Sequence, residues 1–173
     1  MEPTQKDDSP QGKVMAYANT TSVSVERSRA EIERTLQRYG ASKFMYGWDR
    51  EEAVIAFVVH NEGSGEMRQV RFRVYVPPRE DFNTSPAGRW RSDEQITKHW
   101  EQAQRSRWRA LLLVIKAKLE AIDAGIATFE DEFLAYTMLP GGETVGEWIA
   151  PQLDDVYKTG VMPGDLRLAL PAG

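Results

Sequence analysis

Four cationic residues recur at regular intervals in the middle of the sequence. They are Lys98, Arg105, Arg109 and Lys116. Because successive residues of an α-helix turn by about 100°, these side chains would lie within about 20° of one line along a helix. A row of cations can contact successive phosphates of a nucleic acid, each contact adding to a salt-dependent affinity. The other interpretation is an ordinary solvated helix face, and the spacing alone does not decide between the two.

A second candidate site lies on a predicted strand over residues 68–76, where polar and apolar residues alternate. The alternation predicts that Arg71, Arg73 and Tyr75 share one face of the strand, with Phe72 on the other. Cations interleaved with aromatic rings on an open sheet can follow a nucleic-acid backbone and stack on its bases. Exposed arginines are also normal on antiparallel strands, so a purely structural role for this face stays open.

Residue types that enzymes use for covalent or acid–base chemistry are scarce. The chain has no cysteine and two histidines, His60 and His99, which do not share a metal-binding spacing. No serine stands in a Gly-x-Ser-x-Gly elbow, and no glycine-rich phosphate loop ending in Lys and Ser or Thr occurs. We therefore expect a protein that is not an enzyme and that has no cofactor.

Acidic residues cluster at positions 130–132 and 154–155. Neighbouring side chains on a helix point in different directions, so neither cluster can surround a metal ion alone. Carboxylates in the first turn of a helix are also favoured by the helix dipole, which explains the first cluster without a ligand. We expect no metal site, although acids from separate elements could still assemble one.

Composition indicates one soluble globular domain. The 173 residues are 41% hydrophobic and 28% charged, with a formal net charge of −4, which is typical of folded chains. The charge is divided, because residues 68–118 are rich in Arg and Lys, whereas residues 120–165 hold Lys158 as their only cation. No apolar run reaches the roughly 18 residues that a membrane span needs, so we expect no membrane partner. The lack of cysteine and of a secretory signal favours the cytoplasm.

Hydrophobic periodicity predicts the elements that position these residues. Residues 20–25 alternate like a first strand. Ser28 and Glu31 then form a capping box that starts a helix, and Gly40 ends it. Three more strands follow, of which the middle one is apolar on both faces and so expected at the centre of the sheet. Their ranges are 43–48, 53–59 and 68–76.

Helices are predicted for the rest of the chain. A capping box at Ser92 starts a helix of roughly 30 residues that runs to about Ile122. Thr128 caps a shorter helix, and Thr144 caps a third, which Pro151 would kink or split.

Two cations, Arg107 and Lys118, interrupt the apolar face of the long helix. A cation that is buried needs a paired carboxylate. Otherwise its long side chain must extend to the edge of the core. We expect Arg107 to pair with an acid from the later helices, and an anion-binding role for Arg107 in a groove is the alternative.

The predicted order is β-α-β-β-β-α-α-α. This order favours an α+β fold in which a mainly antiparallel four-stranded sheet packs against the long helix and two shorter C-terminal helices. Residues 14–160 would form the single domain, with a flexible N-terminal tail over 1–13 and an irregular C-terminal tail over 161–173. Met15 is an alternative start, because the ordered pattern begins there.

Two segments also carry a resemblance to a known group of proteins. The stretch YANTTSVSVERSRAEIERTLQRYGAS resembles the start of small uncharacterised proteins of actinobacterial phages and prophages, and WEQAQRSRWRALLLVIKAKLEAIDAGIATFEDEFLAYTMLPGGETVGEW resembles their later part. Together the segments cover about half of the chain, and they transfer no catalytic motif. The resemblance implies a phage protein in the cytoplasm of a bacterial host, either handling nucleic acid or interfering with host defence.

Three functions are compatible with these observations. The leading hypothesis is a non-enzymatic accessory protein that contacts nucleic acid through the cationic row, helped by the arginines of the third strand. The second is a protein-binding module that inhibits a host defence complex, favoured by the acidic end of the chain and its net negative charge. The third is a self-assembling structural protein.

Overall fold

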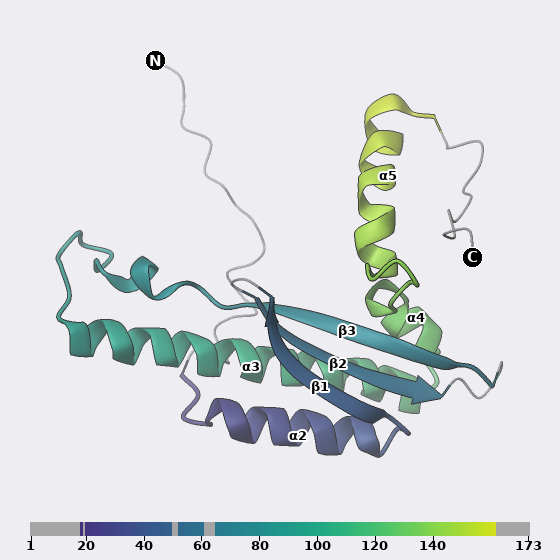
Figure 1. Ribbon diagram of the computed structural model, residues 1–173, viewed down its shortest axis with the longest axis horizontal. Helices are drawn as coiled ribbons and strands as arrows, with labels where there is room; N and C mark the ends of the chain where they lie inside the picture. Colours follow the sequence, from purple (N-terminus) through teal and green to yellow (C-terminus); the bar gives the residue numbers. More distant parts are fainter. Residues whose placement is uncertain (1–17, 19, 50–51, 61–64, 162–173) are drawn as a thin grey trace.

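The computed structural model describes residue 18 and residues 20–49, 52–60 and 65–161 (Figure 1). The flexible tail predicted over 1–13, the alternative start at Met15 and nearly all of the tail predicted over 161–173 lie outside these residues. Helix α2 (Val25–Gln37) precedes strands β1 (Ser42–Asp49), β2 (Glu52–His60) and β3 (Met67–Tyr75). A short 3₁₀ turn η1 (Arg79–Phe82) leads to the long helix α3 (Asp93–Asp123). The chain then forms α4 (Phe129–Phe133), η2 (Leu134–Tyr136) and α5 (Val145–Thr159).

The α+β class is confirmed, but the sheet formed by the described residues has three strands and not four. The strands are antiparallel and ordered β1-β2-β3, with β2 at the centre as the sequence predicts. The strand predicted over residues 20–25 is wrong, because these residues form a turn and an irregular segment that runs into α2. The predicted sheet topology is therefore wrong at its first element.

The start of α2 explains that error. The Ser24 side chain accepts a hydrogen bond from the Arg27 N–H and so caps the helix one turn earlier than predicted. Ser28, the predicted cap, lies inside the helix and is fully buried, and its N–H donates to the Ser24 carbonyl. The alternation of polar and apolar residues before Val25 thus comes from a cap and not from a strand.

One face of the sheet is covered by α2 and α3, which lie side by side (Figure 1). Alternate residues of β2 and β3 point into this layer, including Ile55, Phe57 and Phe72. The helices meet them with large apolar side chains, among them the fully buried Trp108 of α3 and Leu36 of α2. This sandwich of sheet and helices is the hydrophobic core.

Helix α3 is the longest element and confirms the predicted helix. Its 31 residues start at a capping box between Ser92 and Gln95 and correspond to about 46 Å. The helix extends well beyond the sheet, and the chain between β3 and α3 runs back along the protruding part (Figure 1). Arg79 holds the two together through hydrogen bonds to Asp93 and Thr97.

Candidate docking surface on helix α5

The predicted cationic row lies partly in the contact between α2 and α3. Arg109 Nη1 lies 3.1 Å from Glu31 Oε2, and Lys116 Nζ lies 2.5 Å from Glu31 Oε1. The hydrogen bond from Lys116 is the main reason why the pKa of Glu31 lies below its usual value. Arg105 lies 3.6 Å from Glu101 on its own helix, whereas Lys98 is exposed. The four cations do share one side of α3, but three of them face carboxylates.

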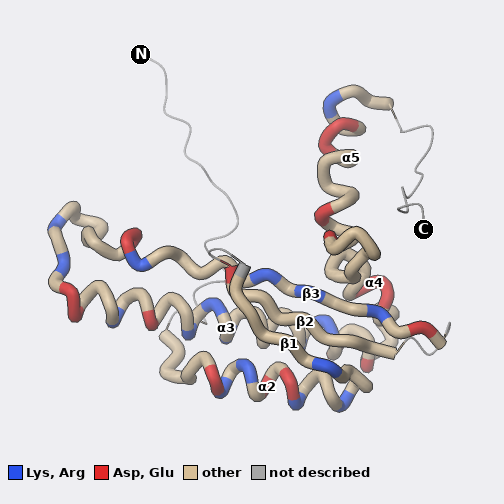
Figure 2. The backbone as a smooth tube through the Cα atoms, in the orientation of Figure 1, with Lys and Arg blue, Asp and Glu red and all other residues tan. Residues whose placement is uncertain are grey.

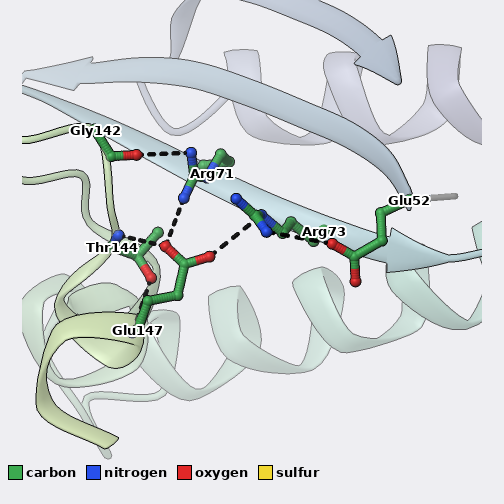
Figure 3. Close-up of polar contacts among 6 residues, drawn as sticks. All are labelled: Glu52, Arg71, Arg73, Gly142, Thr144 and Glu147. Atoms are coloured by element: carbon green, nitrogen blue, oxygen red, sulfur yellow. Dashed lines mark hydrogen bonds and ion pairs between the residues drawn. The ribbon is translucent and has the colours of Figure 1, made fainter. Parts of the chain in front are cut away.

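The two arginines predicted on β3 hold a later helix to the sheet (Figure 3). Arg71 Nη2 lies 2.5 Å from Glu147 Oε2, and its Nη1 donates to the Gly142 carbonyl at 2.9 Å. Arg73 bridges Glu147 Oε1 at 3.2 Å and Glu52 Oε2 at 3.4 Å. Tyr75, the third residue of the predicted strand site, is 45% exposed.

Glu147 joins these contacts to the start of α5. Its carboxylate accepts a hydrogen bond from the Thr144 N–H at 2.7 Å, and the Thr144 side chain accepts one from the Glu147 N–H, which completes the predicted capping box. Partial burial opposes the charged carboxylate, but the Thr144 hydrogen bond and the charges of Arg71 and Arg73 outweigh it and lower the pKa of Glu147. One carboxylate therefore caps α5 and ties it to β3.

Backbone contacts fix the same end of α5. Thr137 forms an isolated antiparallel β-bridge with Val70 of the edge strand β3, and the Met138 N–H donates to the Gln69 carbonyl at 2.8 Å. Gly146 lies so close to η2 that a Cβ atom there would stand 2.8 Å from the Ala135 carbonyl oxygen. Only a residue without a side chain fits this approach, so the base of α5 is held firmly.

Beyond its base, α5 projects away from the body of the molecule (Figure 1). None of its 15 residues is buried. Its apolar side chains nevertheless gather on one side, because Trp148, Ile149 and Val156 fall within about 100° around the helix. These three side chains are half-buried, whereas Leu153 and Tyr157, which extend the stripe on one side, are 47% and 88% exposed. Pro151 lies inside the helix without splitting it.

The other side of α5 is acidic. Glu147, Asp154 and Asp155 lie on this helix with Lys158 as its one cation, and Figure 2 shows the contrast with the mixed charges of the body. The helix thus presents an apolar stripe beside negative charge. An exposed apolar surface of this kind, attached at one end, is typical of a segment that docks on another surface.

The later helices also explain a cation on the apolar face of α3. Lys118 donates to the Glu132 carbonyl at 2.8 Å and lies 3.1 Å from the Glu132 carboxylate, with the Tyr136 ring 5.3 Å from its nitrogen. Lys118 thus pairs with an acid from a later helix, which is the role that the sequence analysis predicted for Arg107. The pairing of Arg107 stays a prediction.

The surface also carries a hollow with several charged side chains. This hollow between α2 and α3 is lined by Arg38, Tyr39, Lys116, Glu120 and Asp123, among other residues. Three of these groups already have partners, since Tyr39 donates to Asp123 and Lys116 contacts Glu31. Within the described part of the chain, no three His, Asp or Glu side chains are grouped as a metal site would need, and none of the helices there has the length and apolar character to cross a membrane.

The chain has no match among known family models, curated proteins or solved structures. The resemblance to actinobacterial phage proteins therefore stays a prediction.

Sequence reasoning did not single out α5 as a functional element. Residues such as Ile149, Leu153 and Tyr157 have the spacing of an ordinary core-facing stripe, and sequence cannot show that the described part of the chain leaves Leu153 and Tyr157 exposed. The available signal was electrostatic, because residues 120–165 combine these apolar residues with many acids and one cation.

Proposed function

We propose that the protein is a protein-binding module and that α5 is the element that docks on its partner. One observation carries the proposal: a 15-residue helix with an apolar stripe has no buried residue among those the structure describes. Isolated helices of this length are marginal in water, and most helices in proteins are stabilised by packing of their apolar face. A partner surface would supply that packing.

The polar contacts that hold the first turn of α5 to β3 support the same interpretation, and we call them the anchor of α5. Arg71, Arg73, Thr144 and Glu147 place polar contacts at one end of the helix, so the helix is presented outward in a defined direction. A segment held in its binding conformation loses less entropy when it binds. The anchor thus prepares the free end of α5 for contact.

The chemistry of α5 specifies the partner surface. Full burial of a large apolar side chain is worth about 1.5–3 kcal/mol, so Leu153 and Tyr157 would contact apolar side chains. Asp154 and Asp155 favour lysine or arginine at the rim of that contact, since complementary charge steers association and selects partners. We therefore expect an apolar surface flanked by cations.

Binding by a double variant tests the proposal. Leu153→Asp together with Tyr157→Asp places charges on the apolar side of α5, whereas Ile126→Asp changes a residue that is 80% exposed outside α5. With the full chain as bait in an extract of the source cells, we expect one defined protein to be captured by the wild type and by Ile126→Asp but not by the double variant. Equal capture of that protein by all three chains would refute a role for α5.

Nucleic-acid binding, the leading hypothesis from sequence, stays a prediction that the geometry favours less. Five of the seven residues expected to carry it contact carboxylates, namely Arg71, Arg73, Arg105, Arg109 and Lys116. Inhibition of a host defence complex also stays a prediction, and it would be one form of the protein binding proposed here.

A further inference from the structure

A small hairpin stands at the far end of the molecule from α5, beside the start of α3 (Figure 1). The Arg91 N–H donates to the Asn83 carbonyl at 2.9 Å, and the Ser85 N–H donates to the Arg89 carbonyl at 2.8 Å. Gly88 closes the turn with a φ of 74°, a left-handed conformation that glycine adopts without strain. We call residues 83–91 the Trp90 hairpin.

The hairpin presents a tryptophan to solvent. Trp90 is 80% exposed, although its backbone is fixed by a bridge to Thr84. Tryptophan is the residue type most enriched at the energetic centres of protein interfaces. A largely exposed tryptophan on a hydrogen-bonded turn is therefore a preformed contact point.

Positive charge flanks this tryptophan. The Arg91 guanidinium donates to the carbonyls of Phe82 and Thr84, which fix its position without cancelling its charge. Arg89 is exposed, and no carboxylate among the described residues lies within ion-pair distance of either arginine. Of the acids that follow, Asp93 pairs with Arg79, and Glu94 is exposed.

The Trp90 hairpin has the character that α5 requires of its partner, namely an apolar group flanked by cations. We propose that the Trp90 hairpin of one chain docks on α5 of a second copy, so that chains assemble head to tail. This inference rests on the proposed function, because it names the partner of the same helix. A single contact of this kind would cover both the Trp90 side chain and the apolar side of α5, which the described part of one chain leaves exposed.

The placement of the two surfaces determines the kind of assembly. The hairpin and α5 lie at opposite ends of the molecule (Figure 1). The cations of the hairpin itself lie between acidic segments of η1 and of the start of α3, and acidic segments also lie along α5 (Figure 2). A contact between two different surfaces repeats from copy to copy and yields a ring or an open chain. Each chain would thus use its hairpin toward one neighbour and its α5 toward the other.

The contact is small, so the assembly should be weak. One tryptophan, two arginines and about two helical turns make an interface at the low end of the size range, typical of transient complexes. We expect a dissociation constant on the order of 10–100 µM. Because opposite charges contribute, raising the salt concentration should weaken the assembly.

Complementing variants test the proposal. Light scattering of the full chain is recorded from about 5 to 500 µM for the wild type, Trp90→Ala, and the double variant Leu153→Asp with Tyr157→Asp. We expect the wild type to exceed the mass of a dimer at high concentration, and each variant alone to weaken association at least tenfold. Mixed in equal amounts, the two variants retain one intact hairpin and one intact α5, so they should form a dimer and no larger species.

Matched variants and a second measurement keep the outcomes distinct. Trp48→Ala removes another exposed tryptophan and Ile126→Asp another exposed apolar residue, and both should assemble like the wild type. A monomeric wild type, a mixture that stays monomeric, or an equal loss in Trp48→Ala would overturn head-to-tail assembly. If the wild type is monomeric but still captures a different protein through α5, the further inference fails and the proposed function stands. If capture also survives the double variant, both fail.

Discussion

At the scale of single residues, buried polar groups determine how α2 meets the core. Ser28 is fully buried and its hydroxyl has no hydrogen-bond partner among the described residues. Thr35 lies two turns later on the same helix and is also buried, but its hydroxyl donates to the Glu31 carbonyl at 2.7 Å. The two residues are therefore buried to a similar extent, but only the Thr35 hydroxyl has a hydrogen-bond partner among the described residues.

Replacement of these two hydroxyls should act in opposite directions. Ser28→Ala removes an unsatisfied buried group and introduces a better helix former, so we expect the free energy of unfolding to rise by about 1 kcal/mol. Thr35→Ala removes a hydrogen bond and a methyl group, and we expect a loss of about 1 kcal/mol. Urea denaturation measures both, and destabilisation by Ser28→Ala would show that its hydroxyl has a partner.

Glu147 should make the stability depend on pH. Its pKa is lower in the folded chain than in the unfolded one, so its contribution is fully present above the unfolded value and is lost as the pH falls through the folded value. Glu147→Gln keeps an oxygen that can cap α5 but loses the charge that faces Arg71 and Arg73. We expect the variant to be less stable by about 1 kcal/mol at pH 7.

The same comparison at low pH completes the test. As the pH falls through the lowered pKa of Glu147 the carboxylate takes up a proton, so the difference between Glu147→Gln and the wild type should shrink toward zero. Glu31 also has a lowered pKa, but it is present in both chains and cancels in the difference. A stability gap that is constant from pH 3 to pH 7 would mean that the charge of Glu147 does not hold α5.

At the scale of elements, α3 and α5 differ most in how deeply their apolar side chains are buried. Trp108, Leu112 and Ile115 of α3 are fully buried in the core, whereas α5 has no buried residue. Stability should therefore depend on α3 and hardly at all on the outer turns of α5.

Thermal unfolding can separate these roles. Leu153→Asp with Tyr157→Asp should change the free energy of unfolding by no more than about 0.5 kcal/mol, as surface substitutions usually do. Leu112→Ala, by contrast, should cost about 2–5 kcal/mol because it leaves a cavity in the core. A loss of several kcal/mol in the double variant would show that α5 packs on its own chain.

Sequence patterns predicted most elements because each has a local signature. The capping boxes at Ser92 and Thr144 start helices as expected, and the apolar run of β2 marks the central strand. The failure at residues 20–25 has a physical cause, because a serine followed by alternating valines satisfies the pattern of a strand as well as that of a helix cap. The local sequence is compatible with both structures. The helix cap is the one that allows α2 to pack on α3.

At the scale of the whole molecule, the charge distribution sets the expected response to nucleic acid. The sequence showed which cations share a face, but it could not show that Glu31 and Glu147 would meet them from distant parts of the chain. Long-range pairing of this kind depends on tertiary structure. The net charge of −4 adds a general repulsion of polyanions.

Fluorescence anisotropy with labelled single- and double-stranded DNA measures that response. We expect no saturable binding at a salt concentration of about 150 mM, and no more than weak binding at about 20 mM. Reversal of Lys98, Arg105, Arg109 and Lys116 to glutamate would then leave the anisotropy at physiological salt unchanged. Tight binding that these reversals abolish would restore the cationic row as the functional site.

The most direct test of the central claim, that α5 is the docking element, is site-specific photo-crosslinking in the full chain. A photoreactive amino acid replaces Tyr157 in one chain and Ile126 in another, since both side chains are largely exposed. We predict a discrete protein adduct from position 157 and none from position 126; head-to-tail assembly would give this adduct the mass of two chains. No adduct from position 157, or the same adducts from both positions, would contradict the claim.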